Sequence, residues 1–249
     1  MIHEPFAVGK SLLHRADPAA KIVSALVLAL SIATSSLVQV AGAALIVSIV
    51  LIAMARLPPV PLAKRLATVN LFILLLWITL PLTGGGEQTI TIGPVTLSDR
   101  GIALAWLITL KANAIYLLLT ALMTTSTVGA IGHALQRMRL PHKLILLLLT
   151  TYRYLARIDL EYWRLRRSAS LRCFHGATNL HTYRTYGYLI GMTLIRSYER
   201  SRRVHQAMLM RGFNGRYPLL LQQSIGAGDL FLLLASILLA LSFSLWTFA

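Results

Sequence analysis

Two arginines, Arg172 and Arg211, each stand near the end of an expected amphipathic helix and precede a small residue and a phenylalanine. The two segments are Ala169-Ser-Leu-Arg172-Cys173-Phe174 and Ala207-Met-Leu-Met-Arg211-Gly212-Phe213. A guanidinium forms forked hydrogen bonds with a carboxylate, and an alanine one turn earlier lets a helix approach another surface closely. The pattern indicates docking onto an acidic partner, although the helix dipole alone also favours basic residues at helix ends.

Two long helices are expected to position these arginines. In the first, apolar residues recur at 3.6-residue spacing between Leu155 and Ala169, and Glu161 lies within ion-pair reach of Arg157 and Arg164. The second is expected over Leu194–Arg211, where Gly212 is a suitable residue to end a helix.

The segments next to these helices are shorter. Cys173–His181 is expected to form a loop between them. Leu144–Leu149 is apolar but too short to span a bilayer, so we expect it to lie against the inner leaflet or other helices.

The positive charge of the chain is concentrated in one block. Residues 129–222 hold 16 Lys and Arg but three acids, a net +13 of the whole chain's +16. Because this block lies between apolar segments, anionic lipid headgroups or an acidic protein are better candidate partners than nucleic acid.

Five apolar segments are candidates to cross a bilayer, in a chain with 56% hydrophobic residues. Continuous apolar runs without alternation exclude membrane strands, so we expect an all-α polytopic membrane protein with about five transmembrane helices and long cytoplasmic amphipathic helices. The first run could also be a secretory signal peptide, but the runs that follow favour a retained span. The segments are Ile22–Val38, Ala41–Ala55, Leu66–Leu82, Ile102–Val128 and Asp229–Ala249.

Basic and non-basic connections alternate along the chain, which indicates its orientation. Lys10, Arg15 and Lys21 precede the first span, and the large basic block precedes the last. Positively charged connections stay in the cytoplasm, so the N-terminus is expected inside and the C-terminus outside. On the outside, Gln88–Ser98 alternates apolar residues with threonines around Gly93-Pro94, which predicts a small β-hairpin.

Two other groups of residues give weaker signals for an active site or a metal site. Gly9-Lys10-Ser11 resembles the end of a P-loop, but Glu4 replaces the glycine that the motif requires, so no ATPase activity is expected. Cys173 with His175 and His181 could hold a metal, yet the basic loop would repel a cation.

Lys111 and Asn113 lie inside an expected span, where ionisable residues are often functional. A snorkelling lysine or a contact with another protein is favoured over a substrate site. We expect no catalytic residue, bound cofactor or metal in this chain.

The chain resembles the T component (EcfT) of energy-coupling factor (ECF) transporters, whose cytoplasmic coupling helices end in two Ala-Arg-Gly-type motifs. Arg211-Gly212 resembles the second motif closely, whereas Leu171-Arg172-Cys173 has leucine and cysteine where alanine and glycine are usual. Asp17-Pro18-Ala-Ala-Lys21, Thr124-Thr125-Ser126 and Tyr152-Arg153-Tyr154 with Glu161 also resemble family segments, and the general character is closest to cobalt-type members.

The resemblance implies a non-catalytic scaffold of the bacterial inner membrane that couples two cytoplasmic ABC ATPases, which bind ATP, to a substrate-binding membrane subunit. Ala169, Arg172, Ala207, Arg211 and Gly212 would form the ATPase-coupling site. The implied cargo is Co²⁺, with a CbiM-like substrate-binding subunit and a small CbiN-like accessory protein. Nickel or a vitamin is the alternative cargo.

The resemblance divides the chain into a membrane region with about four spans (1–128), a coupling-helix region (129–222) and a last transmembrane helix (223–249). Two other classes of membrane protein have sequence requirements that can be checked. A self-sufficient channel or secondary transporter needs polar residues converging at the membrane midplane, and a lipid-modifying enzyme needs paired carboxylates or a His/Asp cluster. The sequence shows neither pattern.

Overall fold

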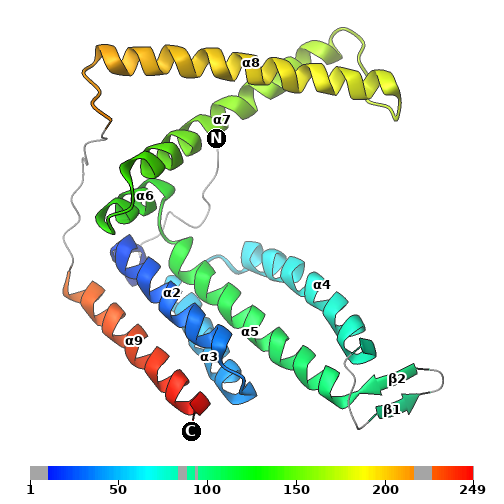
Figure 1. Ribbon diagram of the computed structural model, residues 1–249, viewed down its shortest axis with the longest axis vertical. Helices are drawn as coiled ribbons and strands as arrows, with labels where there is room; N and C mark the ends of the chain where they lie inside the picture. The colour runs from blue at the N-terminus through cyan, green and yellow to red at the C-terminus, as the bar shows by residue number, and fades with distance from the viewer. Residues whose placement is uncertain (1–10, 84–88, 93–94, 216–225, 249) are drawn as a thin grey trace. The chain divides into compact units, whose positions relative to one another are not determined.

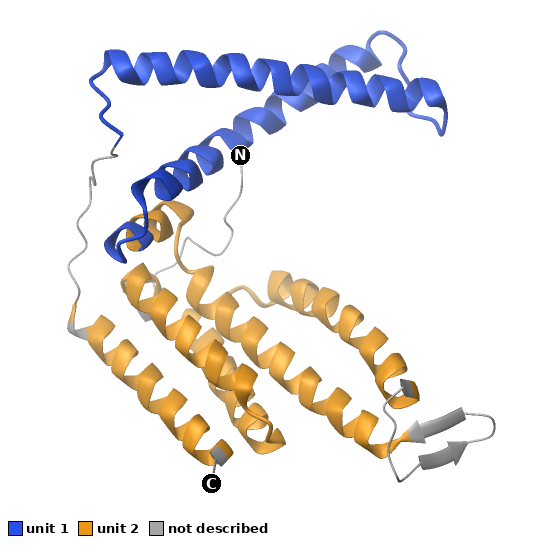
Figure 2. Ribbon diagram, viewed as in Figure 1, with its two compact units in different colours: residues 1–3, 135–222 blue, residues 4–134, 223–249 orange. Residues whose placement is uncertain are grey.

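The computed structural model describes residues 11–83, 89–92, 95–215 and 226–248. It divides into two compact units (Figure 2). The first, here called the membrane unit, comprises Glu4–Ala134 and Gln223–Ala249, and the second, the two-helix unit, comprises Leu135–Gln222 with Met1–His3.

The described part of the membrane unit is built from helices and one small hairpin (Figure 1). The long helix α5 packs against α2, α3 and α4, while α9 packs against α2. The short helix α6 runs across the boundary between the two units. The helices are α1 (Leu12–Arg15), α2 (Pro18–Thr34), α3 (Val38–Ala55), α4 (Pro59–Thr83), α5 (Asp99–Met123), α6 (Val128–Arg137) and α9 (Ala227–Phe248).

Four of these helices are long and apolar enough to cross a membrane, and α2 is a fifth, shorter apolar helix of 17 residues. At 1.5 Å per residue, α2 is about 26 Å long, which is near the lower limit for a span. The predicted all-α polytopic fold is confirmed. The four long segments are Val38–Ala55, Pro59–Leu82, Asp99–Met123 and Gly228–Thr247.

Small residues form the contacts between these helices. Ala41, Ala44, Ala114 and Ala121 are almost completely buried. Because bilayer lipid is as apolar as leucine, close backbone approach through small residues is what holds membrane helices together. Large side chains such as Leu71 point away from the helix contacts, as expected of a lipid-facing surface.

The predicted hairpin is confirmed. Strands β1 (Thr89–Ile92) and β2 (Val95–Ser98) pair antiparallel, with Thr89 opposite Ser98. After β2, α5 begins close to α4, and a Cβ added at Gly101 would clash with the carbonyl oxygen of Leu80. Only glycine therefore fits at this approach of the two backbones.

The two-helix unit consists mainly of α7 (His142–Ser170) and α8 (Leu180–Met210), which cross and contact each other (Figure 1). The apolar stretch Leu144–Leu149 is the start of α7 rather than a separate segment, because no glycine or proline interrupts the chain between residues 142 and 170.

The expected start of the second helix at Leu194 was wrong. Helix α8 begins at Leu180, and it continues through Gly187 and Gly191. A glycine inside a helix costs roughly 1 kcal/mol relative to alanine, which a helix of 31 residues packed against α7 tolerates.

Candidate partner-docking site

Helices α7 and α8 end in the same hydrogen-bonded turn. At the end of α7, the Phe174 N–H donates to the Ala169 carbonyl at 3.2 Å, and the Cys173 N–H donates to the Ser170 carbonyl at 3.1 Å. At the end of α8, the Phe213 and Gly212 N–H groups donate in the same pattern, each at 3.0 Å, to the carbonyls of Met208 and Leu209. Both turns are Schellman motifs, which satisfy carbonyls that the helix leaves without partners.

The geometry of the turn explains why a cysteine can stand after Arg172 where a glycine stands after Arg211. A Schellman turn needs a left-handed residue after the helix, and Cys173 and Gly212 supply it with φ of 60° and 74°. Glycine adopts this conformation freely, whereas a side chain makes it cost roughly 1–2 kcal/mol. The predicted role of Gly212 as the helix-ending residue is therefore confirmed, and Cys173 takes the same role.

The turns also define which residues are equivalent. Arg172 corresponds to Arg211, and Phe174, which is half-buried, corresponds to Phe213, which is also half-buried. The two alanines do not correspond: Ala169 matches Met208, and the exposed Ala207 lies one residue further from its arginine.

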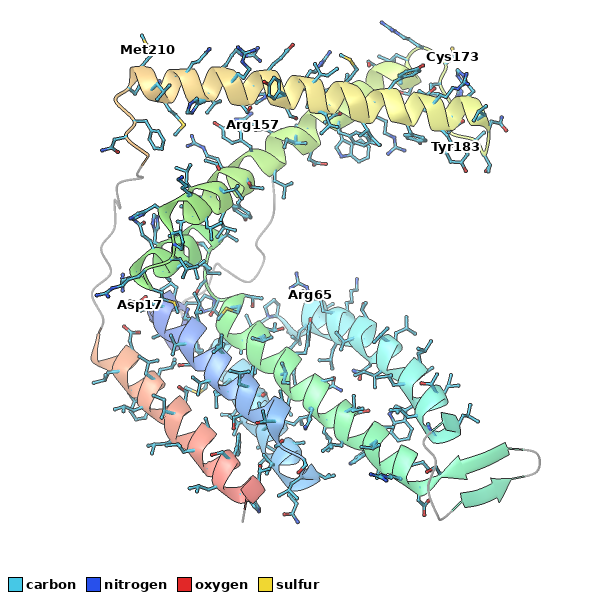
Figure 3. The ribbon with its side chains drawn as sticks, in the orientation of Figure 1. Asp17, Arg65, Arg157, Cys173, Tyr183 and Met210 are labelled. Carbon is cyan, nitrogen blue, oxygen red and sulfur yellow. The ribbon has the colours of Figure 1, made fainter. Side chains whose placement is uncertain are left out.

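Both arginines lie on the surface of the two-helix unit. Arg172 and Arg211 are exposed, and neither forms a salt bridge with any residue that the structure describes. Figure 3 shows Cys173, next to Arg172, and Met210, next to Arg211, toward opposite ends of α8. The unit thus presents two similar cationic tips that are well separated along one helix.

Aromatic contacts hold the first turn against the start of α8. The Phe174 ring meets the Tyr186 ring edge to face, with centroids 5.7 Å apart, and lies 6.4 Å from the His181 ring. In the same loop, the Ala177 N–H donates to the Thr182 hydroxyl at 3.2 Å. These contacts fix Arg172 relative to α8, although Arg172 follows α7 in the chain.

Glu161 links α7 to α8 through a cluster of arginines. Its carboxylate accepts a short hydrogen bond from Arg196 and lies 3.5 Å from Arg200, both on α8, and 3.9 Å from Arg164. The hydrogen bond from Arg196 and the three positive charges lower the pKa of Glu161, against the opposite effect of burial.

Sequence reasoning paired Glu161 with Arg157 and Arg164. The pair with Arg164 is present, but Arg157 makes no ion pair with the described residues, and the cross-helix partners were missed. One sequence pattern could have indicated the cross-helix partners: Arg196 and Arg200 are four residues apart and so lie on one face of a helix. In the structure this face meets Glu161, which is buried.

Two segments that resemble family motifs meet in the membrane unit. Asp17 begins α2 by accepting a hydrogen bond from the Ala19 N–H, and the buried Lys21 donates to Thr125 at 3.3 Å and to Ser126 at 2.9 Å. The Asp17 N–H donates to a carboxylate oxygen of Asp229 at 2.7 Å. The start of α2, the end of α5 and the start of α9 are therefore joined by one buried polar cluster.

Lys111 and Asn113 also have structural partners. The Lys111 ammonium donates to the Ala33 carbonyl at 3.0 Å, in the last turn of α2, where the helix dipole favours a cation. Asn113 and Asn70 exchange amide hydrogen bonds of 3.0 and 3.1 Å between α5 and α4. These contacts favour roles in helix packing over a substrate site.

A largely apolar cavity of about 520 Å³ lies in the membrane unit beside α2, α3 and α9. Its polar side chains include Ser24, Ser236 and Asp229, which hydrogen-bond to one another or to backbone N–H groups. Among the described residues, no group of three or more His, Cys, Asp and Glu side chains could hold a metal ion. Glu4 and Gly9, which bear on the P-loop comparison, lie outside the described residues.

Four long apolar helices and a fifth shorter one, together with a strongly basic two-helix unit, define a multi-pass membrane protein. The chain belongs to the CbiQ family of cobalt transport proteins, because the model of that family matches residues 9–220. It is 29% identical over 140 residues to the cobalt transport protein CbiQ of Rhodobacter capsulatus, an alignment that covers 55% of this chain and 57% of that protein. The family expected from the sequence is confirmed.

Proposed function

We propose that this chain is the energy-coupling membrane subunit of an ECF-type importer for Co²⁺. The observation that carries the proposal is the pair of equivalent helix ends, each presenting an exposed arginine, in a chain of the CbiQ family. One chain with two matching cationic ends suits a partner that offers two acidic grooves, as a pair of ABC ATPases would.

In this mechanism, Arg172 docks on one ATPase and Arg211 on the other. The ATPases bind and hydrolyse ATP, so the chain itself catalyses no reaction. When the ATPases close or separate, they displace the ends of α7 and α8, and coupling requires that the chain contact their two states differently. The Glu161–Arg196 pair couples α7 to α8, so a movement at one docked end is passed to the other helix.

The Co²⁺ is carried by a separate substrate-binding membrane protein, assisted by a small accessory protein. The membrane unit of this chain offers that protein an apolar surface, and buried polar side chains such as Lys21 and Asn113 are occupied in helix packing. Nickel or a vitamin remains the alternative cargo, because cargo selection rests with the partner.

The orientation follows from the charge distribution. The chain lies in the bacterial inner membrane with its N-terminus and the two-helix unit in the cytoplasm, where ATP is available, and with its C-terminus outside. Cys173, the only cysteine of the chain, is exposed and adjoins Arg172. Chemical labelling of its thiol can therefore test on which side of the membrane the two-helix unit lies and whether a partner covers Arg172.

The test is maleimide labelling of Cys173 in membranes. An impermeant maleimide should label Cys173 in inside-out vesicles but not in intact spheroplasts. Adding the purified cobalt-type ABC ATPase from the same genome should slow that labelling at least about tenfold, since docking at Arg172 covers the neighbouring thiol. Labelling in intact spheroplasts would contradict the orientation, and unprotected labelling at saturating ATPase would contradict docking at this site.

A further inference from the structure

The two equivalent helix ends share an apolar feature as well as a cationic one. The residue immediately before each arginine is a large aliphatic side chain, Leu171 in one case and Met210 in the other. Their exposed fractions are 81% and 89%, the two highest among the large hydrophobic residues that the structure describes. Figure 3 shows Met210 at the tip of α8.

The geometry of these side chains is set by the Schellman turns. Because the same two backbone hydrogen bonds close both turns, Leu171 and Met210 leave the backbone at the same place relative to their arginines. An isolated exposed leucine or methionine needs no explanation. A matched pair, each beside an arginine without a described ion-pair partner, indicates a repeated recognition element.

We infer that Leu171 and Met210 are apolar anchors, each of which enters an apolar pocket next to the acid that receives the neighbouring arginine on the ATPase. This inference rests on the proposed function and specifies the partner's surface: an acidic groove with an aliphatic pocket at its end. The excess of basic residues in the two-helix unit makes an acidic partner the complementary one.

The anchors and the arginines contribute in different ways. A charge pair at a solvated rim contributes little to affinity, whereas an apolar side chain that excludes water from a neighbouring pair strengthens it. Binding hot spots, among which arginine is common, lie in well-packed pockets from which the surrounding contacts exclude water. The anchors are therefore expected to set affinity, while the arginines also set its dependence on salt.

The experiment measures binding of the purified cobalt-type ABC ATPase from the same genome to the full chain in lipid nanodiscs, over a series of salt concentrations. Leu171→Gln and Met210→Gln should each weaken binding about tenfold, the effect of removing one buried aliphatic side chain, and leave the salt slope unchanged. Arg172→Gln and Arg211→Gln should weaken binding and also flatten the slope. Leu194→Gln, another exposed leucine of α8, is the matched control and should bind within about twofold of wild type.

A second variant distinguishes loss of the anchors from a general effect of substitution on folding. The exchange variant Leu171→Met with Met210→Leu preserves an aliphatic side chain at both ends, so it should bind like wild type. Normal binding by both glutamine variants, with loss in the arginine variants, would overturn the anchors and leave the proposed function intact. Failure of the wild-type chain to bind would overturn both.

The bilayer is the other surface that could cover these side chains. A bimane attached to Cys173 would then be quenched by spin-labelled lipid in the free chain, and that quenching would fall in Leu171→Gln. This result, together with unchanged ATPase binding, would overturn the inference. The expected result is no lipid quenching and protection of the bimane from aqueous quenchers only when the ATPase is present.

Discussion

Cys173 and Gly212 have the same left-handed backbone conformation, with φ of 60° and 74°. Each lies in the turn that directly follows a long helix. The arginine that precedes each of them is placed by this turn, and the phenylalanine that follows is drawn back toward the helix. The two helix ends are thus structurally equivalent although their sequences differ at most positions.

This equivalence predicts that an alanine at position 212 and a glycine at position 173 have opposite effects on the stability of the two helix ends. Gly212→Ala should destabilise the end of α8 by about 1 kcal/mol, because a Cβ is strained at positive φ even where space is free. Cys173→Gly should stabilise the end of α7 by up to about 1 kcal/mol. Hydrogen exchange of the Phe213 and Phe174 amides measures both; a shift of the two amides in the same direction would contradict the assignment.

Glu161 is predicted to make the contact between α7 and α8 depend on pH. Its pKa is lowered in the folded protein, so its stabilising effect is complete above the ordinary value of 4.5 and is lost as pH falls through the lowered pKa. Glu161→Gln should therefore reduce thermal stability at pH 7, and its difference from wild type should shrink below about pH 4.5. Glu199→Gln, an exposed acid on α8, is the control and should show no such difference.

The two lysines of the membrane unit should differ in their contribution to stability. Lys21 is 1% exposed and donates to two hydroxyls near the carboxylates of Asp17 and Asp229, so Lys21→Met should cost about 3 kcal/mol. Lys111 caps α2 from a more open position, and Lys111→Met should cost less than about 1 kcal/mol. Thermal unfolding in detergent followed by size-exclusion chromatography compares them; equal losses would refute the ranking.

The amide pair between α4 and α5 should show coupling. Asn70→Leu or Asn113→Leu alone leaves the other amide without its partner across the helices. The double variant should be less destabilised than the sum of the two single variants, by about 0.6–2 kcal/mol. The pair Thr68→Val and Asn113→Leu should be additive, since the Thr68 hydroxyl donates to the Lys64 carbonyl of its own helix; additivity at Asn70 as well would disprove the coupling.

The sequence predicted the membrane fold well because the relevant signals are local. Runs of apolar residues mark the spans, and alternation around Gly93-Pro94 marks the hairpin. The helical turn at Gly212 was predictable for the same reason, since glycine after a basic residue is a frequent helix end.

Relationships across long sequence distances were not predictable in this way. Nothing in the sequence near Lys21 indicates that its ammonium meets Thr125, about a hundred residues later. The partners of Glu161 on α8 depend on how two helices cross, and the start of α8 at Leu180 depends on packing that offsets two glycines. These features arise from tertiary contacts, which local propensity does not encode.

In the proposed function, Arg172 and Arg211 transmit ATPase movement to transport. Removing one partner of a desolvated charge pair costs about 2–5 kcal/mol, and reversal to glutamate adds repulsion. A solvated arginine in the same basic block, such as the exposed Arg203, makes no comparable contribution and serves as the control. Arg164 is a poorer control because it lies 3.9 Å from Glu161.

The most direct measurement is the initial rate of ⁵⁷Co²⁺ uptake by proteoliposomes that contain the complete importer and ATP. Arg172→Glu and Arg211→Glu should each reduce the rate at least about thirtyfold, whereas Arg203→Glu should retain more than about half. Equal losses in all three variants would show a diffuse electrostatic surface, and normal uptake by the Arg172 and Arg211 variants would contradict the two-point coupling directly.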